Sequence, residues 1–174
     1  MNRAVYGYFF IGYLFILLQT SLLPHILPSH LKPDLLLILI VYVGLIEGYI
    51  RGGILAYVLG SLFDVFAGHY MGLYGFALLV IFLVVRGTVD RFNTENSVLI
   101  FLMVFAGTFV EGWLLIFSLK FFADAGPIGT VIFWRLFPQA FVNLAATYIL
   151  LKGCVLLQRR VHSRFVIPGL QNLK

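Results

Sequence analysis

Long apolar runs separated by short polar breaks extend over most of the chain. A membrane-spanning helix needs about 20 apolar residues. The run between Pro33 and Gly75 is too long for one crossing, and it is interrupted at Arg51, Gly52 and Gly53. This pattern predicts two short spans joined by a glycine hairpin at residues 51–53.

The same pattern predicts six spans over the whole chain. Proline, glycine and charged residues separate the apolar runs, and such residues end helices or mark turns. The expected spans are residues 5–23, 34–50, 52–67, 73–89, 97–122 and 130–157. The first run is followed by Pro24 and by no small-residue cleavage pattern, so we interpret it as a retained helix rather than a signal peptide.

Composition supports a membrane protein. Hydrophobic residues make up 61% of the chain and charged residues only 11%, whereas soluble domains average about 25% charged residues. The mean hydropathy is +1.02. We therefore expect an all-α, polytopic integral membrane protein, with one transmembrane domain over residues 1–157 and a basic cytoplasmic tail over residues 158–174.

The basic residues orient the predicted spans. With an even number of spans, both termini lie on the same side of the membrane. That side receives nine of the twelve Lys and Arg residues, namely Arg3, Arg51, Arg86, Arg91, Lys152, Arg159, Arg160, Arg164 and Lys174. Basic loops favour the cytoplasm, so both termini are predicted to be cytoplasmic. Five basic residues follow residue 150 beside a span, which favours membrane lipid over nucleic acid as their partner.

Three ionisable residues fall within the predicted spans at similar depth. Counted from the cytoplasmic surface at about 1.5 Å per residue, Asp64 lies about 18 Å deep and Glu111 about 21 Å deep. Arg135 lies about 7 Å below the outer surface. Charges inside a membrane are costly unless they pair, so these three residues form a candidate intramembrane charge cluster in which Arg135 bridges one or both acids.

Two interpretations of this charge cluster stay open. It is either a structural lock between helices or a site for a small molecule or a proton. A pump would need further polar groups along a pathway, and the sequence offers no histidine or broken-helix pattern for one. Glu47 and Arg51 have the spacing of an i,i+4 surface pair at the end of the second span.

Small residues recur every four positions along the second and third spans. Gly44 and Gly48 lie in the second span, and Ala56 and Gly60 lie in the third. Small residues at this spacing let two membrane helices approach closely. These four residues are therefore candidate helix-packing positions.

Catalytic and metal-binding motifs are not found in the sequence. There is no phosphate-binding loop, no HExxH and no GxSxG, and Cys154 is the single cysteine. The four histidines do not have the spacing of metal ligands. We therefore expect no enzymatic activity and no cofactor.

Two segments resemble the family of the rod shape-determining protein MreD. They are the second span KPDLLLILIVYVGL and, after the glycine hairpin, GILAYVLGSLFDVFAGHYMGLYGFALL. The most specific pieces are Pro33-Asp34, Gly60-x3-Asp64 and Gly68-x3-Gly72-Leu73. The resemblance is best over residues 32–91.

The resemblance implies a component of the bacterial elongation machinery in the inner membrane. Such a scaffold would bind MreC, a single-span protein with a large periplasmic part. It would thereby connect MreB filaments to peptidoglycan synthesis by RodA and its class B transpeptidase partner. On the periplasmic side, Asp64, His69, Tyr70 and Tyr74 are the candidate partner-binding residues.

The family's fold is similar to that of the substrate-binding subunits of energy-coupling-factor transporters, and this likeness supplies an alternative function. A vitamin-binding subunit typically carries AxxxA motifs on its first helix and longer outer loops. The first helix here reads YGYFFIGYLFILL, which is bulky and aromatic. The scaffold is therefore the favoured interpretation.

Overall fold

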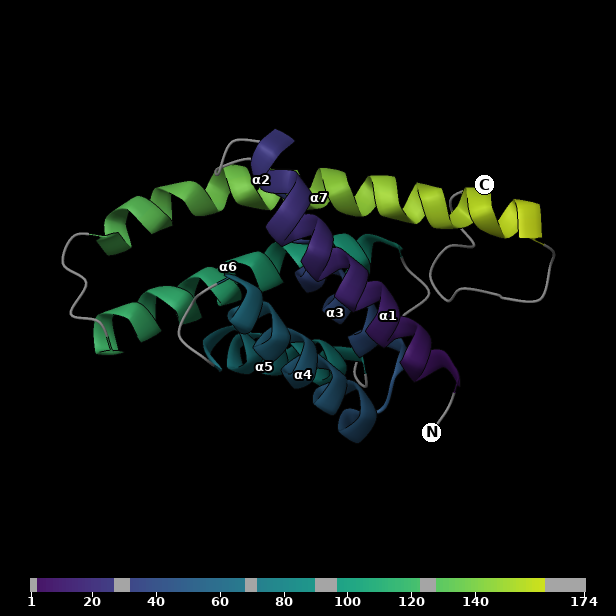
Figure 1. Ribbon diagram of the computed structural model, residues 1–174, viewed down its shortest axis with the longest axis horizontal. Coiled ribbons are helices and arrows are strands. Elements are labelled where there is room, and N and C mark those ends of the chain that lie inside the picture. The colour runs from purple at the N-terminus through teal and green to yellow at the C-terminus, as the bar shows by residue number, and fades with distance from the viewer. Residues whose placement is uncertain (1–2, 27–31, 68–71, 90–96, 123–127, 162–174) are drawn as a thin grey trace.

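The computed structural model describes residues 3–26, 32–67, 72–89, 97–122 and 128–161, and all the regular structure in these ranges is helical. The helices are α1 (Arg3–Leu17), the π-helix η1 (Leu18–Leu22), α2 (Leu23–Ile26), α3 (Leu35–Ile46), α4 (Tyr49–Ala67), α5 (Leu73–Val89), α6 (Ser97–Phe122) and α7 (Ile128–Val161). Because α1, η1 and α2 follow one another without a break, the helices form six rods (Figure 1). The prediction of an all-helical chain is confirmed.

Three of these rods are long and apolar enough to cross a membrane, over Val5–Ile26, Tyr49–Phe66 and Val98–Phe117. Two shorter apolar helices, Leu35–Ile46 and Leu73–Val89, accompany them. The bounds of α5 and α6 match the predicted fourth and fifth spans. Helix α7 continues to Val161, beyond the predicted end of the sixth span.

Helix α3 lies at the centre of the bundle. Its sequence LLLILIVYVGLI is apolar on every side, which is typical of a buried helix. Leu36, Leu37, Ile40, Val41 and Val43 are each 0% exposed. The helix packs against α1, α4, α5, α6 and α7, whereas α6 and α7 lie side by side as the two longest helices (Figure 1). The core is therefore organised around α3.

The first rod does not end before Pro24, as the sequence predicted, but continues to Ile26. Proline lacks an N–H group and clashes with the carbonyl four residues earlier in an α-helix. Directly before Pro24 the chain widens into the π-helix η1, in which the Leu23 N–H reaches the Leu18 carbonyl. This wider turn contains the backbone carbonyl with which the proline ring would clash in a regular α-helix.

The hairpin between the second and third rods is also displaced from its predicted position. Helix α3 ends at Ile46 and α4 begins at Tyr49, so the turn is at Glu47 and Gly48. Gly52 lies inside α4, where an added Cβ would collide with the Phe82 ring. Gly52 therefore lets α4 pack closely against the Phe82 ring and does not form a turn. Because the helix is broken after Glu47, the expected i,i+4 pair with the following arginine lacks its helical geometry.

Helices α4 and α5 approach closely at Gly60 and Gly75. A Cβ at Gly60 would be 2.6 Å from the Cα of Gly75, and a Cβ at Gly75 would be 2.6 Å from the Ser61 Oγ. Such contacts between backbones require small residues. The α4–α5 hairpin is therefore held at backbone distance, which brings the end of α4 to the start of α5.

The other candidate packing residues differ in their surroundings. A Cβ at Gly44 would meet Val85 at 2.8 Å, and Ala56 is 0% exposed. Gly48 is exposed in the turn, and a Cβ there would meet no atom within 4 Å. The expectation that Gly48 packs against a helix is therefore corrected, because α3 ends before it.

Gly60→Ala is expected to destabilise the fold by about 1–3 kcal/mol, because the new methyl group would press on a backbone that cannot rotate away. The matched control is Gly87→Ala, where a Cβ meets nothing within 4 Å and alanine improves helix propensity. Thermal unfolding of both purified variants in one detergent measures the difference. Equal unfolding temperatures would contradict the close approach of α4 and α5.

Candidate functional site

Near the end of α4, the side chain of Asp64 caps the start of α5. Its Oδ2 accepts hydrogen bonds from the backbone N–H groups of Gly72 (3.0 Å), Tyr74 (3.0 Å) and Gly75 (3.3 Å). The first N–H groups of a helix have no partner inside it, and the helix dipole favours a negative charge there. Gly72 has a positive φ of 89°, a conformation suited to glycine. Asp64, only 1% exposed, is thus a cap supplied by a neighbouring helix.

Asp34 has the same role at the start of α3. Its Oδ1 accepts from the Leu37 N–H at 2.9 Å and from the Gln19 Nε2 at 3.3 Å. Its Oδ2 accepts from the Tyr74 hydroxyl at 2.6 Å, and its own N–H donates to the Asn143 Oδ1 at 2.7 Å. Because Tyr74 also bonds Asp64 through its N–H, it connects the two helix caps.

Further hydrogen bonds extend these contacts to α6 and α7. The Asn143 Nδ2 donates to the Thr108 Oγ1 at 3.0 Å, and this hydroxyl donates to the Val104 carbonyl at 2.9 Å. One turn before Asn143, the Gln139 Nε2 donates to the Lys32 carbonyl at 2.9 Å. Asn143 is 0% exposed, so α7 is joined to α3 and α6 by groups that are shielded from solvent.

Glu111 on α6 completes the arrangement. Its side chain is 6% exposed and interacts electrostatically with Asp34 and Tyr74. We call the whole set the polar cluster; it comprises Gln19, Asp34, Asp64, Tyr74, Thr108, Glu111 and Asn143. Its members come from η1, α4, α5, α6 and α7 and from Asp34, the residue that caps α3, so the cluster joins all six rods.

The polar cluster is built to hold helices together. Except for Gln19 Oε1, its donors and acceptors are directed at helix ends and at one another. Buried polar groups need such partners because an unpaired one costs about 1–3 kcal/mol. Across the part of the chain that the structure describes, no group of three His, Cys, Asp or Glu residues could hold a metal ion. These contacts favour the structural interpretation of the predicted charges.

Two of the three members of the predicted charge cluster have described side chains, and their neighbours differ. The described contacts of Asp64 are with backbone N–H groups, and Glu111 lies beside Asp34 and Tyr74. Arg135 belongs to α7, but its side chain is outside the described residues. The proposed bridge by Arg135 therefore stays a prediction.

Of the four predicted partner-binding residues, two are described by the structure and two are not. His69 and Tyr70 lie outside the described residues. Asp64 is buried, and the Tyr74 hydroxyl is bonded to Asp34. The expectation that Asp64 and Tyr74 form part of an accessible surface is therefore corrected, because both act within the fold.

Sequence reasoning missed several members of the polar cluster. Asp34 directly precedes an apolar run, which is the position of a helix cap and was a usable signal. Gln19, Thr108 and Asn143 are uncharged polar residues inside apolar runs, and such residues bond between membrane helices. Their partners lie as far away in sequence as Asp34 and Asn143, so the pairing depends on the tertiary fold.

Asp64→Ala is expected to destabilise the protein by about 2–4 kcal/mol, because three backbone N–H groups lose their buried acceptor. Asp64→Asn, which keeps one acceptor oxygen, should lose less. Ser61→Ala is the matched control one turn earlier, since the Ser61 Oγ is buried without a hydrogen-bond partner. Thermal unfolding in detergent measures all three variants, and a loss in Ser61→Ala as large as that in Asp64→Ala would contradict the capping role.

Comparison with known proteins agrees with the resemblance seen in the sequence. The family model for the rod shape-determining protein MreD matches residues 2–161 of the 174-residue chain. Neither a curated protein nor a solved structure matches the chain significantly. Because the family model covers nearly the whole chain, including every helix of the bundle, this protein belongs to the MreD family of rod shape-determining proteins.

Proposed function

We propose that this protein is a non-enzymatic membrane scaffold of the bacterial cell-elongation complex. In this role it binds MreC and helps to position peptidoglycan synthesis, acting with MreB, RodA and a class B transpeptidase. The observation that carries the proposal is the match of residues 2–161 to a family of shape-determining proteins. Maintenance of rod shape is the role that the family implies.

The structure supports a rigid scaffold in two ways. Apart from Gln19 Oε1, which has no hydrogen-bond partner among the described residues, the buried donors and acceptors of the polar cluster bond to helix starts or to one another, and these bonds stabilise one arrangement of the bundle. The longest connection between described helices is the eight residues 27–34. Connections of this length leave no room for an inserted catalytic domain. The helical region therefore acts through the bundle and its two membrane surfaces.

The topology that we propose has all six rods crossing the inner membrane, with both termini in the cytoplasm. In this orientation the polar cluster lies in the periplasmic half of the membrane. The turn at Glu47 and Gly48 lies at the cytoplasmic surface. We also propose that the fold of the bundle is similar to that of the substrate-binding subunits of energy-coupling-factor transporters. Residues 1–157 then form one transmembrane domain.

The connection between α4 and α5 is our proposed contact for the periplasmic part of MreC. Asp64 holds the two ends of this connection together through its bond to Gly72. His69 and Tyr70 lie between these two residues in the sequence. Because the two ends of this short connection are held in place, it would lose less conformational entropy when a partner binds.

Depletion of the protein in its host tests the proposed function. Rod-shaped cells are expected to become round as the protein is lost, because the elongation complex loses a membrane component. Cell width and length are measured by microscopy, with wild-type complementation as the control. Retained rod shape together with a new vitamin requirement would reject the scaffold in favour of the transporter subunit.

The double variant His69→Ala, Tyr70→Ala tests the proposed contact with MreC. Co-purification of MreC from membranes is expected to fall several-fold, because two side chains of the contact are removed. The control is Ile50→Ala, which alters an exposed side chain at the opposite end of α4. Wild-type recovery of MreC by the double variant would place the contact elsewhere.

A further inference from the structure

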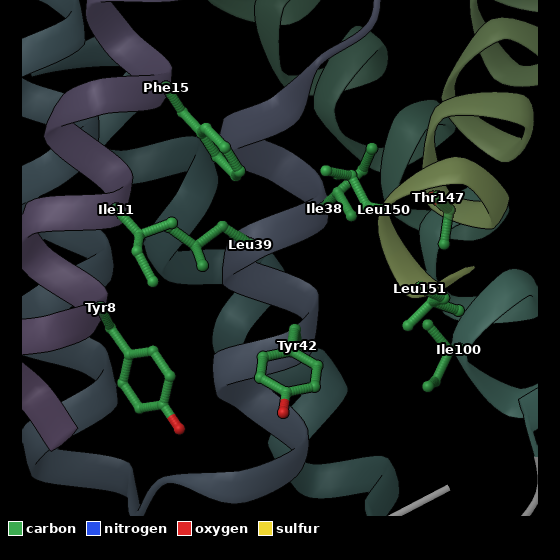
Figure 2. Close-up of a pocket in the computed structure, with 10 residues that line it drawn as sticks. All are labelled: Tyr8, Ile11, Phe15, Ile38, Leu39, Tyr42, Ile100, Thr147, Leu150 and Leu151. Atoms are coloured by element: carbon green, nitrogen blue, oxygen red, sulfur yellow. The ribbon is translucent and has the colours of Figure 1, made fainter. Parts of the chain in front are cut away.

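The first rod is packed against the bundle over only part of its length. Ile16 on α1 is 0% exposed, and Figure 2 shows Tyr8 and Phe15 directed from α1 toward side chains of α3. Neither η1 nor α2, which continue the rod over residues 18–26, has a buried residue. We call residues 18–26 the arm. Few buried contacts mean that a segment can move at little cost, so packing restrains the arm much less than it restrains α1.

The side chain of Gln19 fastens the arm to the start of α3. Its Nε2 donates to the Pro33 carbonyl at 3.2 Å and to the Asp34 Oδ1 at 3.3 Å. Both distances exceed the usual N–H···O distance of about 2.9–3.0 Å. The Oε1 of the same side chain is buried and has no hydrogen-bond partner among the described residues. An unpaired buried acceptor costs free energy, which offsets part of what the two bonds contribute.

The cap of α3 does not depend on Gln19. The Asp34 Oδ1 also accepts from the Leu37 N–H at 2.9 Å, and the Asp34 Oδ2 accepts from the Tyr74 hydroxyl at 2.6 Å. If Gln19 leaves, these bonds stay in place and its own Oε1 is no longer buried. The attached and detached positions of the arm are therefore close in free energy.

The arm begins at a point where the first rod can bend. Sharp bends in helices occur at proline and at π-helical turns. The rod has both, because the π-helix η1 is followed by α2 with its Pro24. Pro24 has no N–H group with which to bond the preceding turn. A bend at η1 moves the arm and leaves α1 packed against α3 and α4.

We propose that the arm is a latch with two positions. It is closed when Gln19 bonds the start of α3, as in this structure, and open when the arm bends away at η1. In the open position the Pro33 carbonyl and the Asp34 Oδ1 can accept hydrogen bonds from a partner, so opening and binding of that partner favour each other. The latch thus regulates access to the start of α3. It is independent of the proposed contact with MreC, which lies between α4 and α5.

Distances between spin labels test this proposal. The full chain carrying Cys154→Ser is reconstituted in nanodiscs and labelled through Ile26→Cys on the arm and Phe76→Cys on α5, both at exposed positions. Gln19→Leu removes both bonds to the start of α3 and should raise the share of a second Ile26–Phe76 distance several-fold over wild type. Adding Pro24→Ala to this variant restores a backbone N–H in the rod and should lower that share again.

Thr20→Val is the matched control, because the Thr20 hydroxyl donates to the Ile16 carbonyl within the first rod. It should leave the distances unchanged. A second label pair, Phe10→Cys with Phe76→Cys, reports on α1, where Phe10 is exposed, and should not respond to Gln19→Leu. Wild-type distances between labels at 26 and 76 in Gln19→Leu would overturn the proposal. An equal change for the labels at 10 and 76 would overturn it too, since the whole rod would then move.

Discussion

The carboxylate of Asp64 determines how the bundle closes at one end. Inside a bilayer no water is available to satisfy the N–H groups at a helix start, so another part of the protein must do so. Asp64 supplies the acceptor from the preceding helix, and it reaches α5 because Gly60 and Gly75 let the two backbones approach. The charge and the glycines thus depend on one another: without the close approach, the carboxylate would be buried and unpaired.

The rest of the polar cluster extends this constraint to every rod. Tyr74 donates its N–H to Asp64 and its hydroxyl to Asp34, which caps α3 and is bonded to Asn143 on α7. One end of the bundle is therefore joined by directional hydrogen bonds.

Much of the helical arrangement could be predicted from the sequence, because apolar runs indicate membrane helices and the polar interruptions between them indicate where those helices end. The bounds of α5 and α6 follow from Leu73 after a glycine and from Ser97 after a polar segment. The hairpin was misplaced because Gly52 resembles a turn residue, whereas its role is to accommodate the Phe82 ring. Glycine has both uses, and only the tertiary structure distinguishes them.

The polar cluster was only partly predictable for a related reason. Burial of an acid such as Asp64 indicates that a partner must exist, but it does not say whether that partner is a side chain or a helix start. A cationic side chain was the expected partner, whereas the described structure gives backbone N–H groups. Helix caps supplied from a different helix have no local sequence pattern, because their spacing depends on how the helices pack.

Hydrogen–deuterium exchange of the protein in nanodiscs tests the central claim most directly. If Asp64 caps α5, Asp64→Ala should accelerate exchange of the Gly72, Tyr74 and Gly75 amides, which lose their acceptor, while the amides of α6 around Val104 keep their protection. Unchanged exchange of these three amides in the variant would contradict the capping role of Asp64.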